Sequence, residues 1–71
     1  MDKQLAGLCV MCNICFDGEI AQVQDAADEH GLDVALSAMK RLSMLPVSRH
    51  KHPVDVFQDV LANKLRARSR G

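Results

Sequence analysis

Three cysteines near the N-terminus have the spacing of a metal site. Cys9, Cys12 and Cys15 form a Cys-x-x-Cys-x-x-Cys pattern, and thiolates are strong ligands for zinc and for iron–sulfur clusters. The residues between them are apolar apart from Asn13, whereas backbone N–H groups face sulfur best on turns with small or polar spacers. We therefore expect the cysteines to pack as small apolar residues on one helix face and expect no cofactor. The alternatives are a Cys-ligated metal or iron–sulfur centre, completed by a histidine, and redox or dimer-crosslinking thiols.

Two basic segments could bind an anionic partner. Arg49-His50-Lys51-His52 precedes an expected helix, and Lys64 to Arg70 carries a base at every second position. Such a segment can bind nucleic acid or an acidic protein surface; alternatively it is a solvated helix end that complements the helix dipole. No aromatic residue is interleaved, which disfavours base stacking. The candidate basic contact residues are Arg49, Lys51, Lys64, Arg66, Arg68 and Arg70.

The charges of the chain are separated along the sequence although they sum to zero. Residues 1–35 carry a net charge of −6, and residues 36–71 carry +6. Such an asymmetry suggests a charged partner without naming it. The candidate acidic contact residues are Asp25, Asp28 and Glu29. The two surfaces of opposite sign could meet each other in a self-assembly, or each could meet a different partner.

Motifs of known enzyme classes do not occur in this sequence. It contains no glycine-rich phosphate loop, no nucleophile elbow and no zinc-protease histidine pair, so we expect no enzymatic activity. A helix–turn–helix reading of 23–41 is disfavoured because Ser37 and Lys40 fall where that motif needs core residues. No family resemblance emerges from these residues.

Four segments have the apolar periodicity of helices. The first is expected over Lys3 to Phe16 with Asp2 as N-cap, the second over Gly18 to His30 with Asp17 as N-cap, the third from residue 32 or 33 to Leu45, and the fourth from Pro53. Gly31 is expected to end the second helix and Pro46 the third. The apolar stripe expected for the third helix is Leu32, Ala35, Leu36, Met39 and Leu42. A strand over Leu5 to Phe16 is the alternative.

The first of these helices is apolar nearly all round. A chain of 71 residues has little interior in which to hide such a helix, so we expect self-association, as a dimer. The expected self-association residues are Leu5, Leu8, Val10, Met11 and Ile14.

Composition limits the class of protein. Aromatic residues make up 3% of the chain and hydrophobic residues 48%, so the core must be aliphatic, which favours helices. The longest apolar run, Leu5 to Phe16, is shorter than the roughly 20 residues of a membrane span. An odd number of cysteines disfavours a closed disulfide framework and favours a reducing cytoplasm.

The sequence therefore predicts one small all-α domain over residues 1–71, with three to four short helices in a bundle or helical hairpin and a frayed basic tail from residue 68. We expect a non-enzymatic protein–protein interaction module: a cytoplasmic adaptor, inhibitor or regulator of the kind common among bacterial and phage accessory proteins. The alternatives are a nucleic-acid-associated regulator that uses the basic half and a metal or iron–sulfur protein.

Overall fold

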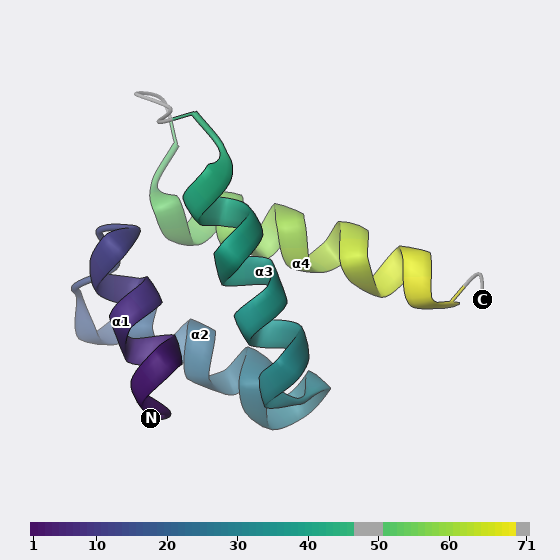
Figure 1. Ribbon diagram of the computed structural model, residues 1–71, viewed down its shortest axis with the longest axis horizontal. Helices are drawn as coiled ribbons and strands as arrows, with labels where there is room; N and C mark the ends of the chain where they lie inside the picture. Colours follow the sequence, from purple (N-terminus) through teal and green to yellow (C-terminus); the bar gives the residue numbers. More distant parts are fainter. Residues whose placement is uncertain (47–50, 70–71) are drawn as a thin grey trace.

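The chain forms four α-helices, shown in Figure 1, in a computed structural model that describes residues 1–46 and 51–69. They are α1 (Lys3–Met11), α2 (Asp17–His30), α3 (Leu32–Met44) and α4 (Pro53–Ser69). The described residues contain no strand, which confirms the all-helical prediction and excludes the strand alternative for α1. The radius of gyration is 11.3 Å, close to the roughly 11 Å expected for a folded domain of this length.

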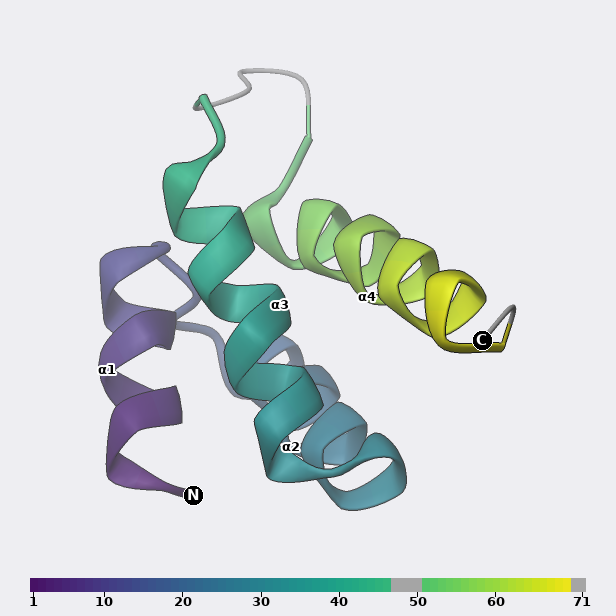
Figure 2. The ribbon, with the colours of Figure 1, turned by 45° about the vertical axis from the view of Figure 1, so that its right-hand side comes forward.

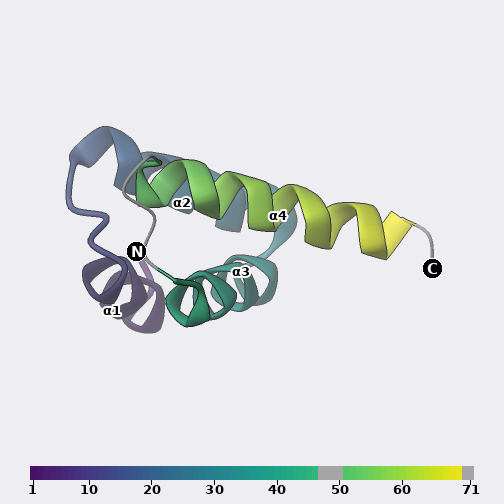
Figure 3. The same cartoon turned by 90° about the horizontal axis from the view of Figure 1, so that it is seen from above.

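The helices lie in two layers that cross each other. Seen from above, α1 and α3 form one layer, and α2 and α4 form the other (Figure 3). Helices α1 and α3 run side by side in the same direction, so their C-terminal ends lie at the same end of the molecule (Figures 1 and 2). Helix α3 packs against each of the other three. The core therefore surrounds α3.

Helix α1 is shorter than its apolar pattern predicts. Asp2 caps its start as expected, accepting hydrogen bonds from the backbone N–H groups of Gln4 and Leu5 at 2.9 and 3.2 Å. The helix ends at Met11 rather than Phe16 because Asn13 adopts a left-handed conformation, with φ of 63°.

A Schellman motif closes this end of the helix. The Ile14 N–H donates to the Cys9 carbonyl at 2.8 Å, and the Asn13 N–H donates to the Val10 carbonyl at 3.1 Å, which satisfies two carbonyls that the helix end would leave free. The reversal turns Ile14 into the core, where it is 1% exposed.

The corner between α2 and α3 depends on Gly31. Gly31 has φ of 102° and ends α2 as predicted, its N–H donating to the Ala27 carbonyl at 2.9 Å. The positive φ favours glycine, because a residue with a Cβ is strained there; a Cβ would also lie 2.8 Å from a carboxylate oxygen of Asp33, whose side chain would have to move. At its other end α2 starts one residue early: Phe16 is the N-cap, and Asp17 is the first helical residue instead of the cap. Its carboxylate still interacts favourably with the positive, N-terminal end of the helix dipole and so stabilises α2.

Helix α3 presents a wider apolar face than the predicted stripe. Its buried residues are Val34, Ala35, Ala38, Met39 and Leu42. Leu36 is half-buried, whereas Leu32 is 40% exposed, so its assignment to the inner stripe was wrong: it lies in the first turn, beside the corner. Ala35 and Ala38 are fully buried, and their small side chains let neighbouring helices approach closely. Leu45 is extended (ψ 150°) because it precedes Pro46.

Helix α4 begins at Pro53 as predicted and continues through Ser69. Residues 68 and 69 of the expected frayed tail are therefore helical, and residues 70–71 lie outside the described part of the chain. Its inner face consists of Val54, Phe57, Val60 and Leu61, which are buried, and of Leu65, which is half-buried against the core.

We predict that Phe57→Ala removes most of the stability. Phe57 is the largest fully buried side chain, and truncation of a buried Phe costs about 3–5 kcal/mol, against a total of about 4–10 kcal/mol for a domain of this length. Urea denaturation followed by circular dichroism measures the loss. Met44→Ala is the control, since Met44 is 79% exposed; equal stability of the two variants would contradict the packing.

We also predict opposite effects of two substitutions at Asn13. Asn13→Gly should leave the free energy of unfolding unchanged or raise it, because glycine adopts a positive φ without strain. Asn13→Val should lower it by about 1–2 kcal/mol, because a β-branched residue is strained in a left-handed conformation that asparagine tolerates. The same denaturation measurement distinguishes them, and equal effects would show that the Schellman turn does not end α1.

Candidate functional site

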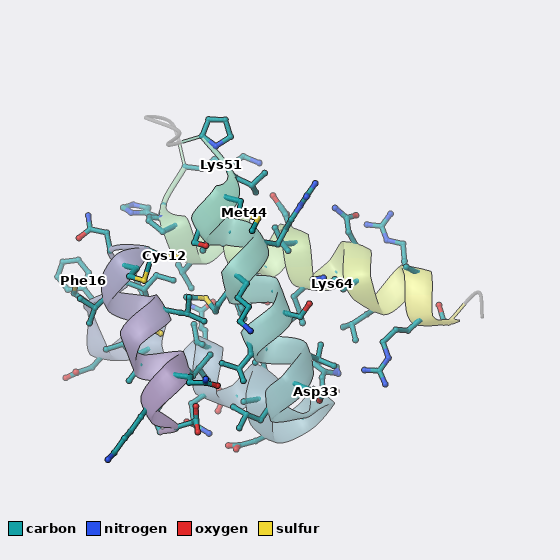
Figure 4. The ribbon with its side chains drawn as sticks, viewed as in Figure 1. Cys12, Phe16, Asp33, Met44, Lys51 and Lys64 are labelled. Atoms are coloured by element: carbon teal, nitrogen blue, oxygen red, sulfur yellow. The ribbon has the colours of Figure 1, made fainter. Side chains whose placement is uncertain are left out.

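Four large apolar side chains are exposed around the C-terminal ends of α1 and α3. Val10 and Met11, in the last turn of α1, are 72% and 74% exposed; Phe16, in the connection to α2, is 75% exposed; and Met44, which ends α3, is 79% exposed. We call this region the apolar end, defined by these four residues. Figure 4 shows Phe16 and Met44 on either side of the end of α1. A small domain gains nothing in stability from such exposure, which is typical of contact surfaces when it is concentrated in one region.

A groove of about 230 Å³ lies between α1, α3 and the start of α4, and Met11 is the residue of the apolar end that lines it. Its lining is apolar or uncharged apart from Lys51: Met11, Cys12, Asn13, Leu42, Ser43, Leu45, Pro46, Lys51, Pro53 and Val56. Met44 is not itself a lining residue but is adjacent in the sequence to two of them, Ser43 and Leu45. The Lys51 ammonium contacts a carboxylate oxygen of Asp59 at 3.2 Å. The groove therefore offers apolar contact with little fixed charge.

The structure separates the five residues predicted to mediate self-association. Leu5 and Ile14 are buried in the core at 0% and 1% exposure, and Leu8 is partly buried against it. These three side chains pack within one chain, and Leu5 and Ile14 cannot contact a second copy in this fold. Val10 and Met11 alone among the five are exposed. The crossing layers thus cover more of α1 than the sequence suggested.

The three cysteines occupy different environments instead of one helical stripe. Cys9 lies in α1 and is buried, Cys12 caps the helix and is half-buried, and Cys15 is exposed beyond the turn. The Cys12 thiol lies 3.9 Å from the Met39 carbonyl oxygen, and the Cys15 thiol lies 4.0 Å from the side-chain oxygen of Asn13. Core packing is therefore the role of Cys9 and in part of Cys12, but not of Cys15. The early end of α1 explains the difference.

The thiols do not form a recognisable metal centre. Across residues 1–46 and 51–69, no three His, Cys, Asp or Glu side chains are grouped so that they could hold a metal ion. Burial raises the pKa of the Cys9 thiol above its ordinary value of 9.0, and the neighbouring Cys12 and Cys15 add to the shift. Burial also raises the pKa of Cys12. Both groups are therefore neutral thiols at pH 7, which makes them weak nucleophiles.

The predicted basic residues do not form one continuous surface in the described structure. Lys51 is paired with Asp59 near the start of α4, whereas Lys64, Arg66 and Arg68 belong to its C-terminal half. Lys64 is half-buried, and both arginines are exposed. Arg49 and Arg70, which were also predicted, lie outside the described residues.

The predicted acidic residues share the C-terminal half of α2. Asp25, Asp28 and Glu29 are all exposed. Asp28 accepts a hydrogen bond from the Gln24 side-chain amide at 2.8 Å, and Glu29 lies 3.8 Å from the His30 imidazole. The carboxylates of all three residues therefore remain accessible to a partner.

Sequence reasoning missed two residues of the apolar end. The sequence predicts Phe16 as the last residue of a helix that in fact ends at Met11, and it gives Met44 no role. Asn13 was the available signal for Phe16, because asparagine is one of the few residues that adopt a left-handed conformation readily. For Met44 the signal was weaker: it falls outside the stripe that contains Met39 and Leu42.

We predict that the thiols are alkylated in the order Cys15, then Cys12, then Cys9. Exposure gives this order, and the raised pKa of Cys12 and Cys9 reinforces it because thiolate is the reactive form. Iodoacetamide labelling followed by peptide mass spectrometry measures the three rates. Equal labelling rates in the folded protein would contradict the burial.

The raised pKa values of Cys9 and Cys12 also predict a pH dependence of stability. The unfolded chain loses these two thiol protons at lower pH than the folded chain, so the free energy of unfolding should fall as the pH rises above 9.0.

No helix in the described part of the chain is long and apolar enough to cross a membrane.

Comparison with known proteins gives no relative. No protein-family model, no curated protein and no solved structure matches this chain.

Proposed function

We propose that this protein is a small, non-enzymatic interaction module that binds a partner protein through the apolar end. The observation that carries the proposal is the exposure of Val10, Met11, Phe16 and Met44, each by more than 70%. No polar or charged residue is buried among the described residues, so the interior is a hydrophobic core that supports the fold and contains no reactive polar group. Its unusual chemistry lies on the surface, which is the expected arrangement for an adaptor, inhibitor or regulator.

The groove supports this assignment by its shape and its lining. An apolar anchor side chain from a partner could enter the 230 Å³ hollow, and such anchors in pockets dominate the binding energy of protein interfaces. Met11 lines it, and a methionine side chain adapts to different partner surfaces because it is flexible and polarisable.

Thiol chemistry is the weaker explanation for this end of the molecule. Cys12 lines the groove, but its raised pKa keeps it protonated at neutral pH, and it has no histidine or carboxylate partner among its described hydrogen bonds. The three free cysteines suit a protein of the reducing cytoplasm. A binding role uses the groove without requiring reactivity.

Nucleic-acid binding is the second candidate, and one observation favours it. The C-terminal half of α4 projects beyond the rest of the fold in Figure 1, and it carries Lys64, Arg66 and Arg68. No carboxylate of the described residues forms an ion pair with these three bases. Such a helix could contact phosphates without sequence preference.

We predict that the triple variant Met11→Ser, Phe16→Ser, Met44→Ser loses partner binding while it keeps its fold. The three side chains are at least 74% exposed, so their removal should change stability by less than about 0.5 kcal/mol each. The immobilised protein is used to capture partners from a lysate of its source cells, and quantitative mass spectrometry compares each captured protein between variants.

The matched control is Lys3→Ser, Ala21→Ser, Ala62→Ser, because these three positions are exposed and lie outside the apolar end. The expected result is a partner retained by the wild type and by the control and depleted at least tenfold by the triple variant. Equal capture by all three proteins, or capture of nothing, would overturn the proposal.

A further inference from the structure

A second groove, of different character, separates α3 from the C-terminal half of α4. It consists of two hollows of about 360 and 460 Å³ that share Lys64 and Ala67. On the α3 side, Asp33, Ser37 and Arg41 line it. These residues are spaced four apart and therefore lie on one face of the helix. The remaining lining residues are Val34, Leu45, Val60, Asn63 and Arg68. We call this feature the α3–α4 groove.

The α3–α4 groove is positively charged and has an apolar floor. Arg41 stands on one wall and Lys64 and Arg68 on the other, against a single acid, Asp33; Figure 4 shows Lys64 on α4 beside α3. None of the three bases is within ion-pair distance of a described carboxylate. Val34 and Val60 are buried beneath them. A protein segment with carboxylates suits such a groove better than a nucleic acid, since phosphates gain nothing from the apolar floor.

The chain itself carries a helix face with the complementary charge. Asp25 and Glu29 are four residues apart on α2, and Lys64 and Arg68 are four residues apart on α4. Residues at this spacing lie one helical turn apart on the same face, so the two charge pairs have the same pitch. Asp28 lies on the same exposed face between them. Two helices packed side by side could align both pairs at once.

We propose that the α3–α4 groove binds the acidic face of α2 of a second copy of this chain. The contact joins unlike surfaces, so it repeats as a closed ring or an open chain unless a two-fold arrangement pairs it reciprocally. It goes beyond the proposed function: none of the four residues of the apolar end lines this groove, and Leu45 is the one lining residue that it shares with the groove described above. Charge complementarity of this kind sets the register and the encounter rate and is weakened by salt.

The experiment is sedimentation velocity of the full chain at low and high salt. The wild type should associate at about 50 mM salt, with an association constant at least tenfold lower at about 500 mM, because added ions screen exposed charges. The variants Lys64→Glu, Arg68→Glu and Asp25→Lys, Glu29→Lys should each be monomeric at low salt. An equimolar mixture of the two should associate again, since each reversed face then meets its complement.

Controls separate this contact from the other readings. Lys3→Glu, Lys40→Glu makes the same change in net charge as Lys64→Glu, Arg68→Glu, but at exposed positions outside the groove, and should associate as the wild type does. Circular dichroism must show that every variant keeps its helices. The Met11→Ser, Phe16→Ser, Met44→Ser variant should also associate normally, so that failure of the apolar-end proposal leaves this one intact.

Three results would overturn the proposal: a wild type that stays monomeric at low salt, a mixture of reversed variants that fails to associate, or association lost only in the apolar-end variant. A labelled DNA duplex of mixed sequence tests the competing occupant. If the wild type remains monomeric and binds the duplex, and Lys64→Glu, Arg68→Glu loses that binding, the groove is a phosphate-binding surface instead.

Discussion

The packing of α3 against all three other helices is the constraint on which the rest of the structure depends. The helix presents two fully buried alanines, Ala35 and Ala38, and a fully buried Met39, so partners approach it closely from more than one side. The chain has two aromatic residues, and only Phe57 is buried, so aromatic rings fill little of the space around the central helix. Close approach over small side chains, together with the single buried ring of Phe57, provides the packing density that such a core needs.

Two left-handed residues determine how the chain surrounds α3. Asn13 ends α1 after nine residues and turns Ile14 inward, and Gly31 redirects the chain from α2 into α3. An α1 that continued to Phe16 would carry its apolar residues away from the core. The short helix instead lies alongside α3, and the segment that follows crosses to the second layer (Figure 3). The exposure of Phe16 is a consequence of that reversal, because the turn places it outside the layer interface.

The surface that results has three regions with distinct chemistry. The apolar end includes Met11 and Met44 because α1 and α3 run side by side in the same direction, so that their C-terminal ends lie at the same end of the molecule (Figure 2). The α3–α4 groove is positive because bases in the last turns of both helices complement their dipoles and because α4 extends beyond α3 (Figure 1). The acidic face belongs to α2 alone. Apart from Phe16, which lies in the connection between α1 and α2, the residues of these regions belong to helix ends and helix faces.

The sequence by itself determined the number of helices, most of their ends and most of the buried positions. The signals for helices and their ends act locally, so they can be recognised without knowledge of the tertiary structure. They are the apolar periodicity, the Asp2 cap, Gly31, Pro46 and Pro53. The end of α1 was missed because an apolar run outweighed a single asparagine. The tertiary structure alone decided that Leu5 and Ile14 are satisfied within one chain and that Met11 and Met44 share one end. It also decided that Lys64 and Arg68 face Arg41 across a groove. These relations depend on the crossing of layers and the direction of α3, and residues far apart in sequence do not encode their mutual distance in any local pattern.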